Sequence, residues 1–288
     1  MTTAAATGSV RTKTTRVKGR NNYLGGLFAW LWLAVIIVPI YYVVITTFKD
    51  QGEYFTSNPL ALPIPPTFTP YQQVVEAGIG RYFLNSVIVT IGAVVPIVQF
   101  SFLASYAIVR GDSRFLRFSR SLFLFGLAIP LQATIIPIYL IITRIRMYDT
   151  LGALILPMIA FGIPLTVLIL SNFLRDVPRE LFESMRLDGC TDWQMAWRLA
   201  FPLVRPAIVT VTIYNALHVW NGFLFPLILT QSPELRVLPL ALWAFQGEYS
   251  VNIPAVLAAV VVSTLPILVL YVVGRRQLLS GLTAGFGK

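Results

Sequence analysis

The side chains that could support catalysis are few in this sequence. His218 is the only histidine and Cys190 the only cysteine, so the chain offers neither an H-E-x-x-H metal site nor an internal disulfide framework. It also lacks the G-x-S-x-G nucleophile motif and the G-x-x-x-x-G-K-[ST] loop that cradles nucleotide phosphates. We therefore expect neither catalysis nor ATP hydrolysis from this chain, and we interpret His218 as a polar contact between helices.

Charged residues gather in one stretch, residues 175–205. Within it, Pro178 suits the first position of a helix and Gly189 suits its end, while Thr191-x-x-Gln194 matches a capping box that would begin a second helix. The stretch is expected to form two short amphipathic helices at a sharp angle. Such a projection could dock into another protein or lie on a lipid surface, and these residues alone leave both interpretations open.

Six uncharged apolar segments make up most of the remaining chain. Hydrophobic residues account for 56% of the sequence and charged residues for 12%, about half the charged share of a soluble domain. A helix needs about 20 residues to cross a hydrocarbon layer of about 30 Å. Segments of that length without Asp, Glu, Lys or Arg lie at 23–48, 82–109, 121–143, 151–174, 206–230 and 251–274. The sequence therefore predicts an all-α membrane protein with six transmembrane helices.

The basic residues are divided unequally between the two sides of these segments. Seventeen of the 22 lysines and arginines lie in the N-terminal tail, the second and fourth connections and the C-terminal tail. Because such residues concentrate in cytoplasmic loops, both termini and the 175–205 stretch are expected to be cytoplasmic. The net charge of +10 then reflects topology and attraction to anionic lipid, and we do not expect nucleic-acid binding.

This topology divides the chain into four regions. Residues 1–22 would form a basic cytoplasmic tail, and residues 23–81 the first span followed by a proline-rich outer loop, extended rather than helical. Residues 82–274 would form a five-helix core that carries the cytoplasmic loop 175–205, and residues 275–288 a cytoplasmic C-terminal tail. The first apolar run is too long for a cleaved signal peptide, so it is interpreted as a retained span.

The 175–205 loop resembles a family motif. Glu183, Gly189 and the later Leu199-x-Phe201-Pro202 are similar in spacing to the EAA loop, E-A-A-x3-G-x9-I-x-L-P, of permease subunits of ATP-binding-cassette (ABC) importers. In that family the loop is the coupling helix, which sits in a cleft of a cytoplasmic ATPase subunit. The resemblance assigns this coupling role to Glu183, Ser184, Met185, Asp188, Gly189 and Pro202.

Two features of this loop affect what the resemblance implies. Ser184 and Met185 replace the two alanines of the family motif, and the larger Met185 suggests an ATPase groove with different packing. Glu183 also lies one turn after Arg179, so a local ion pair is the alternative to a role at the ATPase.

Further segments extend the resemblance over most of the chain. They are similar to the sugar-importing branch of the family, and in particular to the second, shorter permease of maltose-type importers. These segments are Phe83-Leu-Asn-Ser86, Ile136-Pro-Ile-Tyr139, Trp220-Asn-Gly-Phe-Leu-Phe-Pro226 and the ending Arg275-Arg-Gln-Leu-Leu-Ser-Gly-Leu-Thr-Ala-Gly-Phe-Gly-Lys288. The resemblance implies a type I ABC importer permease fold in the bacterial inner membrane. It also implies a second permease as heterodimer partner, a cytoplasmic ATPase dimer that binds ATP and magnesium, an extracytoplasmic substrate-binding protein and a sugar substrate. No cofactor or metal is expected on this chain itself.

The lack of acidic residues in the six segments separates classes of transporter. Carriers driven by protons or sodium usually hold an ionisable residue within their spans, and no Asp or Glu lies in any of these. An ion-coupled carrier is therefore disfavoured. Importers of polyamines, peptides or phosphate esters remain the alternatives to a sugar importer.

Two groups of residues are candidates for contact with substrate and with the binding protein. In the fifth segment, Trp220 offers a ring that can stack on a pyranose, and Asn221 an amide that can hydrogen-bond hydroxyls. Gln132 is a further pathway candidate. Trp220 could instead pack between helices, and Asn221 could hydrogen-bond a neighbouring backbone group. The resemblance assigns contact with the binding protein to three aromatic residues of the outer loop: Trp243, Phe245 and Tyr249. Their alternative role is an interfacial aromatic belt.

Overall fold

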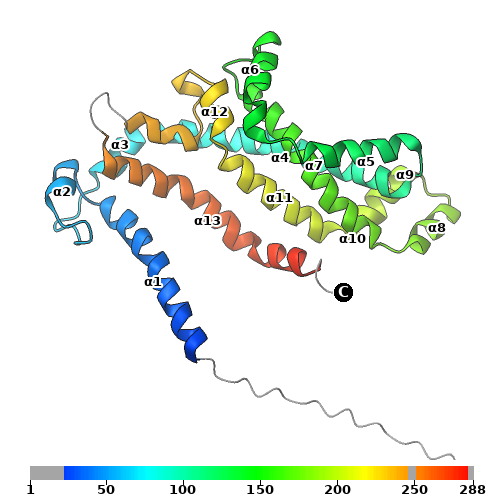
Figure 1. Cartoon of the computed structure of the whole chain (residues 1–288), viewed down its shortest axis with the longest axis horizontal. Helices are drawn as coiled ribbons and strands as arrows, with labels where there is room; N and C mark the ends of the chain where they lie inside the picture. Colours follow the sequence, from blue (N-terminus) through cyan, green and yellow to red (C-terminus); the bar gives the residue numbers. More distant parts are fainter. Residues whose placement is uncertain (1–22, 246–250, 285–288) are drawn as a thin grey trace, which may run out of the picture. The chain divides into compact units, whose positions relative to one another are not determined.

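A computed structural model describes residues 23–245 and 251–284 as a series of helices (Figure 1). The chain divides after Tyr42 into two units. The first unit contains most of α1 (Tyr23–Thr46), the predicted first span, whose large apolar side chains such as Trp30 are exposed as in a lipid-facing helix. The predicted tail 1–22 lies outside the described residues.

The second unit begins with a segment that differs from the prediction. The sequence predicts an extended loop over residues 49–81, but the segment contains two short helices, α2 (Gln51–Thr56) and α3 (Thr69–Glu76). Pro70 lies in the first turn of α3, where a missing backbone N–H breaks no hydrogen bond. The prediction of an extended loop is therefore wrong, because a proline in the first turn is compatible with a helix.

Three long helices form the centre of the second unit. They are α4 (Ile79–Arg110), α7 (Leu151–Arg175) and α11 (Arg205–Trp220), and they correspond to the predicted second, fourth and fifth spans. α4 packs along α7 and also contacts α11 (Figure 1). Among their apolar side chains, buried Asn215 of α11 donates to Thr166 Oγ1 of α7 over 2.9 Å, so this amide has a partner inside the core.

The two largest apolar clusters of this unit lie along α4 and α7. One, which takes no residue from the predicted loop 175–205, includes Val89, Ala93, Ile97, Leu154 and Phe225. The loop-side cluster includes Phe102, Tyr106, Leu174, Phe182 and Met195. Since the loop-side cluster takes Phe182 and Met195 from the predicted cytoplasmic loop, this loop is part of the folded core.

Two predicted spans are interrupted. The third, predicted as one helix over 121–143, consists of α5 (Arg114–Gly126), η1 (Leu131–Thr134) and α6 (Ile135–Arg144), with a bend of 99° at the break. Pro130 lies at this break, where it cannot continue a helical hydrogen-bond ladder. The fifth, predicted over 206–230, ends at Trp220, and a separate short helix α12 (Leu224–Leu229) follows. The prediction of continuous helices is wrong for both.

The number of spans depends on how these bent pairs are treated. Among the described residues, α1, α4 and α7 are long and apolar enough to cross a membrane, and five segments qualify if each bent pair is one span. The predicted sixth span begins α13 (Ile253–Ala284), whose described apolar part is Ile253–Val269. The all-α architecture is confirmed, whereas the six-span count and the orientation stay predictions.

Asp149, in the turn before α7, forms hydrogen bonds with the segment that follows α12. Its carboxylate accepts hydrogen bonds from the Ser232 hydroxyl (2.5 Å) and from the backbone N–H groups of Gln231 (2.8 Å) and Ser232 (3.0 Å). The Ser232 hydroxyl, followed by these N–H groups, holds the pKa of Asp149 below its usual value, because all three bonds favour the ionised carboxylate. The segment continues through two 3₁₀ helices, η3 (Pro233–Leu235) and η4 (Leu238–Phe245).

Candidate functional site

Two helices lie between α7 and α11, as the sequence predicts. α8 (Arg179–Leu187) projects at one edge of the second unit in Figure 1 and begins directly after Pro178, which occupies the N-cap rather than the expected first helical position. α9 (Asp192–Met195) continues through the π-helical turn η2 (Ala196–Ala200) and the short helix α10 (Phe201–Leu203). Exposed Pro202 lies in α10, just before the chain bends by 78° into α11.

The two sides of α8 differ in what they contact. Phe182 is 6% exposed and packs in the loop-side cluster, and half-buried Met185 packs against the same cluster. Glu183, Ser184 and Leu187 are exposed, and Leu187 is 90% exposed. Because residues three and four apart share one side of a helix, α8 presents a stripe with a carboxylate, a hydroxyl and a leucine away from the protein's own core.

Gly189 ends α8 in the left-handed conformation that the sequence predicts. Its φ is 79°, a conformation that costs an ordinary L-residue about 1–2 kcal/mol. The Gly189 N–H donates to the Arg186 carbonyl (3.1 Å), and the Cys190 N–H donates to the Met185 carbonyl (3.0 Å), which is the Schellman pattern. A Cβ at Gly189 would meet no heavy atom within 4 Å. The glycine is therefore required by the backbone and not by lack of space.

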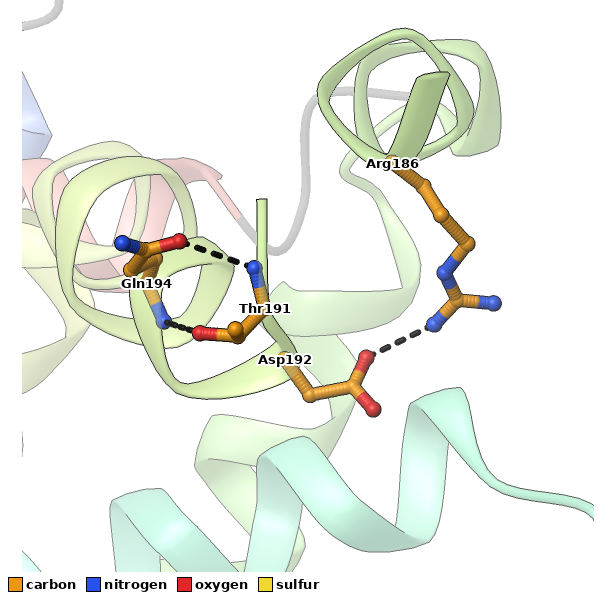
Figure 2. Close-up of polar contacts among 4 residues, drawn as sticks. All are labelled: Arg186, Thr191, Asp192 and Gln194. Carbon is orange, nitrogen blue, oxygen red and sulfur yellow. Dashed lines mark hydrogen bonds and ion pairs between the residues drawn. The ribbon is translucent and has the colours of Figure 1, made fainter. Parts of the chain in front are cut away.

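Polar contacts fix the turn from α8 into α9 (Figure 2). The Gln194 N–H donates to Thr191 Oγ1 (3.3 Å) and the Thr191 N–H donates to Gln194 Oε1 (2.9 Å), so the predicted capping box is confirmed. Arg186 Nη2 lies 2.6 Å from Asp192 Oδ1 and links the two helices across Gly189. Both charged side chains are exposed, so this pair orients the turn more than it stabilises the fold.

The structure bears on two interpretations of α8. Half-buried Met185 packs against the loop-side cluster, and its contact with an ATPase groove stays a prediction. Within the described part of the chain, Glu183 forms no ion pair with Arg179; the arginine of α8 that is paired is Arg186. Exposed Asp188 caps the end of α8, and the Ser184 hydroxyl donates to the Glu180 carbonyl (2.8 Å).

A hollow of about 620 Å³ lies between η1 and the C-terminal end of α11. Gln132 and Asn221, two of the predicted pathway residues, both line it. Tyr214 and His218 line it as well, and their rings stack with centroids 6.2 Å apart and 6° between the planes. The hollow thus offers aromatic faces, a ring nitrogen and two amides to a polar molecule. His218, expected to contact another helix, instead stacks within its own.

Trp220 does not share this hollow with Asn221. Its Nε1 donates to the Ser263 carbonyl of α13 over 3.3 Å, and its ring meets Phe83 of α4 edge-on at 5.8 Å. Neighbouring residues on a helix point in different directions, so Trp220 packs between helices while Asn221 faces the hollow. Trp220 and Asn221 together line a separate pocket of about 250 Å³ beside α13, so their joint contact with substrate stays a prediction.

Comparison of the sequence with models of protein families shows which family contains this chain. A family model described as "binding-protein-dependent transport system inner membrane component" matches residues 98–277, which include α8, the hollow and most of the core. The chain belongs to this family. It is therefore a permease component of a transport system, and the EAA-like spacing lies within the matched residues.

Relatives resemble this permease over most of its length. A putative ABC transporter permease protein, ORF2 of Caldicellulosiruptor sp. strain Rt8B.4, is 38% identical over 259 residues, 90% of this chain and 94% of that protein. The diacetylchitobiose uptake system permease protein NgcG of Streptomyces coelicolor is 32% identical over 258 residues, 88% of this chain and 85% of that protein. A chain of a bacterial ABC transporter involved in alginate import matches with a TM-score of 0.76 and 21% identity, over 89% of this chain and 97% of that chain. The permease fold implied by the EAA-like motif is thus confirmed.

The segment that holds the predicted binding-protein contacts is described only in part. Phe245 packs against Val74 of α3 and against Ala258 and Ala259 of α13. The side chain of Trp243 and the whole of Tyr249 lie outside the described residues. Contact of these aromatic residues with a binding protein therefore stays a prediction, and Phe245 has a packing role within the permease.

The sequence did not assign Leu187 to the exposed stripe of α8, nor Tyr214 and His218 to the hollow beside η1. Leu187 follows Glu183 by four residues, so helical spacing alone places it in the exposed stripe of α8. The same spacing joins Tyr214 to His218. The sequence does not show that α11 ends at Trp220. Asn221 follows this helix end and lines the hollow.

Proposed function

We propose that this permease forms half of the translocation pathway of an ATP-driven sugar importer in the bacterial inner membrane, with α8 coupling it to a separate ATPase. The placement of α8 carries this proposal. Phe182 fixes its inner side to the loop-side cluster, while Glu183 and Leu187 stand exposed on the other side. Because protein interiors are close-packed and transmit displacement, a force applied to α8 would reach α4 and α7.

The partners follow from this role. The proposed orientation puts both termini and α8 in the cytoplasm, where an ATPase dimer binds ATP and magnesium and performs the hydrolysis. A dimer has two clefts and this chain provides one α8, so a second permease fills the other cleft. An extracytoplasmic binding protein delivers the substrate to the opposite face. These assignments rest on the basic-residue distribution and on the family.

A sugar fits the chemistry of the hollow. Tyr214 and His218 present aromatic faces, which stack on apolar faces of pyranose rings, and Gln132 and Asn221 present amides that donate to and accept from hydroxyls. The name of the diacetylchitobiose relative supports the same substrate class.

Sugar uptake by the reconstituted complex tests this proposal. We expect proteoliposomes that contain both permeases and the ATPase to take up sugar only with ATP and the binding protein. Asn221→Ala and Gln132→Ala should each raise the half-saturation concentration about fivefold, since one lost hydrogen bond costs on the order of 1 kcal/mol.

Trp220→Phe is the matched control, because it changes an aromatic residue next to Asn221 that faces α4 and α13. Its half-saturation concentration should equal that of the wild type. An increase with Trp220→Phe, together with unchanged values for Asn221→Ala and Gln132→Ala, would move the sugar contacts out of this hollow.

A further inference from the structure

Arg110, the last residue of α4, stacks on the proposed coupling helix. Its guanidinium carbon lies 3.2 Å from the centroid of the Phe182 ring of α8. Tyr106, one turn earlier on α4, places its ring 6.3 Å from the same Phe182. The end of α4 therefore holds α8 by one aromatic side chain, which is buried in the loop-side cluster.

The Phe182 ring partly offsets the cost of burying the Arg110 guanidinium. Arg110 Nε and Nη2 are buried and have no hydrogen-bond partner in the part of the chain that the structure describes. Burying charged nitrogen without a partner is costly, and a cation over an aromatic face recovers part of that cost, most effectively where water is excluded. Loss of the Phe182 ring would remove this contact from the two buried nitrogens.

α8 meets α4 through the apolar side chains of the loop-side cluster and through Arg110. A hollow of about 380 Å³ lies beside these contacts, with Arg110, Phe182 and Glu183 among its lining residues. Figure 1 shows α8 extending beyond the neighbouring helices. The Arg110–Phe182 stack thus adds a cation to an interface that is otherwise apolar.

The opposite end of α4 holds the segment after α12. The Asn85 amide donates to the carbonyls of Glu234 (2.8 Å) and Arg236 (2.9 Å), and the Ser86 hydroxyl accepts from the Leu238 N–H (2.8 Å). One continuous helix therefore contacts α8 at one end and this segment, which leads into the predicted binding-protein loop, at the other.

We propose that Arg110 is a positioning residue for coupling: its stack on Phe182 makes α4 follow α8 when the ATPase displaces α8, and α4 carries that displacement to residues 234–238. This inference rests on the proposed function, since it requires α8 to meet the ATPase. It adds the cationic link that connects α8 to a transmembrane helix.

The ratio of ATP hydrolysed to sugar transported tests this inference in the reconstituted complex. Arg110→Ala should raise the ratio on the order of tenfold, as expected for the loss of a desolvated cation–π contact. Phe182→Leu, which keeps apolar bulk in the cluster, should raise it similarly, and the double variant should be no worse than either single one. Arg110→Lys, which keeps a cation, should restore most of the coupling.

Arg114→Ala is the control, because Arg114 is an exposed arginine of the same connection. Its ratio should match that of the wild type. A purely structural role would lower transport and hydrolysis together and leave the ratio unchanged, and that result with Arg110→Ala would overturn the inference alone. A wild-type complex that hydrolyses ATP without sugar uptake would overturn the proposed function and the inference with it.

Discussion

Glu183→Ala is expected to abolish ATP-driven uptake and to weaken co-purification of the ATPase. In the permease alone this carboxylate is exposed and has no ion pair among the described residues, so the fold does not need it. At the ATPase it would be desolvated against a basic side chain. Removal of one member of such a pair costs about 2–5 kcal/mol, a loss of affinity from about 30-fold to several thousand-fold.

Arg179→Ala provides the comparison for Glu183→Ala. Arg179 lies one turn away on the same helix, is exposed and forms no ion pair with Glu183. Its removal should leave uptake and ATPase co-purification nearly unchanged, while both variants still purify with the second permease. Equal damage from the two substitutions, or normal uptake in both, would show that α8 does not couple through Glu183.

Leu187→Asp is expected to release the ATPase from an otherwise intact permease pair. Leu187 is 90% exposed at the end of α8, so an aspartate there disturbs no packing within the chain. Burial of a leucine in a partner's groove contributes about 1.5–3 kcal/mol, and an unpaired carboxylate buried in its place would cost more. We expect almost no ATPase to co-purify and no uptake.

Leu187→Met keeps the apolar volume and should retain ATPase binding, because such exchanges cost less than about 1.5 kcal/mol. The two variants also separate a protein groove from a lipid surface. If α8 lay on lipid, Leu187→Asp would leave the ATPase bound to the permease pair, and the proposed docking surface would be wrong.

Much of the fold follows from composition and local signals. Uncharged runs of about 20 residues locate α1, α4, α7 and the start of α13 within a few residues. Gly189 and the Thr191–Gln194 pair fix the boundaries of α8 and α9, because caps are set by neighbours in sequence. The broken third and fifth spans were not predicted, since hydropathy measures apolar length and does not detect a bend.

The sequence predicts where the candidate coupling helix lies but not which of its side chains face the core. The EAA-like spacing identifies α8, but it does not show that Met185 packs inward or that Leu187 stands exposed. Which side of a helix is buried depends on the helices packed against it. Likewise, Trp220 and Asn221 are adjacent in sequence and share the pocket beside α13, but only Asn221, which follows the last residue of α11, also lines the hollow beside η1.

Site-directed photo-cross-linking from α8 tests the central claim most directly. Leu187→Cys in a Cys190→Ser background gives the permease a single cysteine, which a photoactivatable maleimide can label before the ATPase is added. Arg114→Cys in the same background reports on the neighbouring connection between α4 and α5. Docking of α8 in the ATPase cleft predicts that the ATPase is the main adduct from position 187 and only a minor one from position 114. Adducts confined to lipid or to the second permease at position 187, with the ATPase unlabelled, would contradict the coupling role of α8.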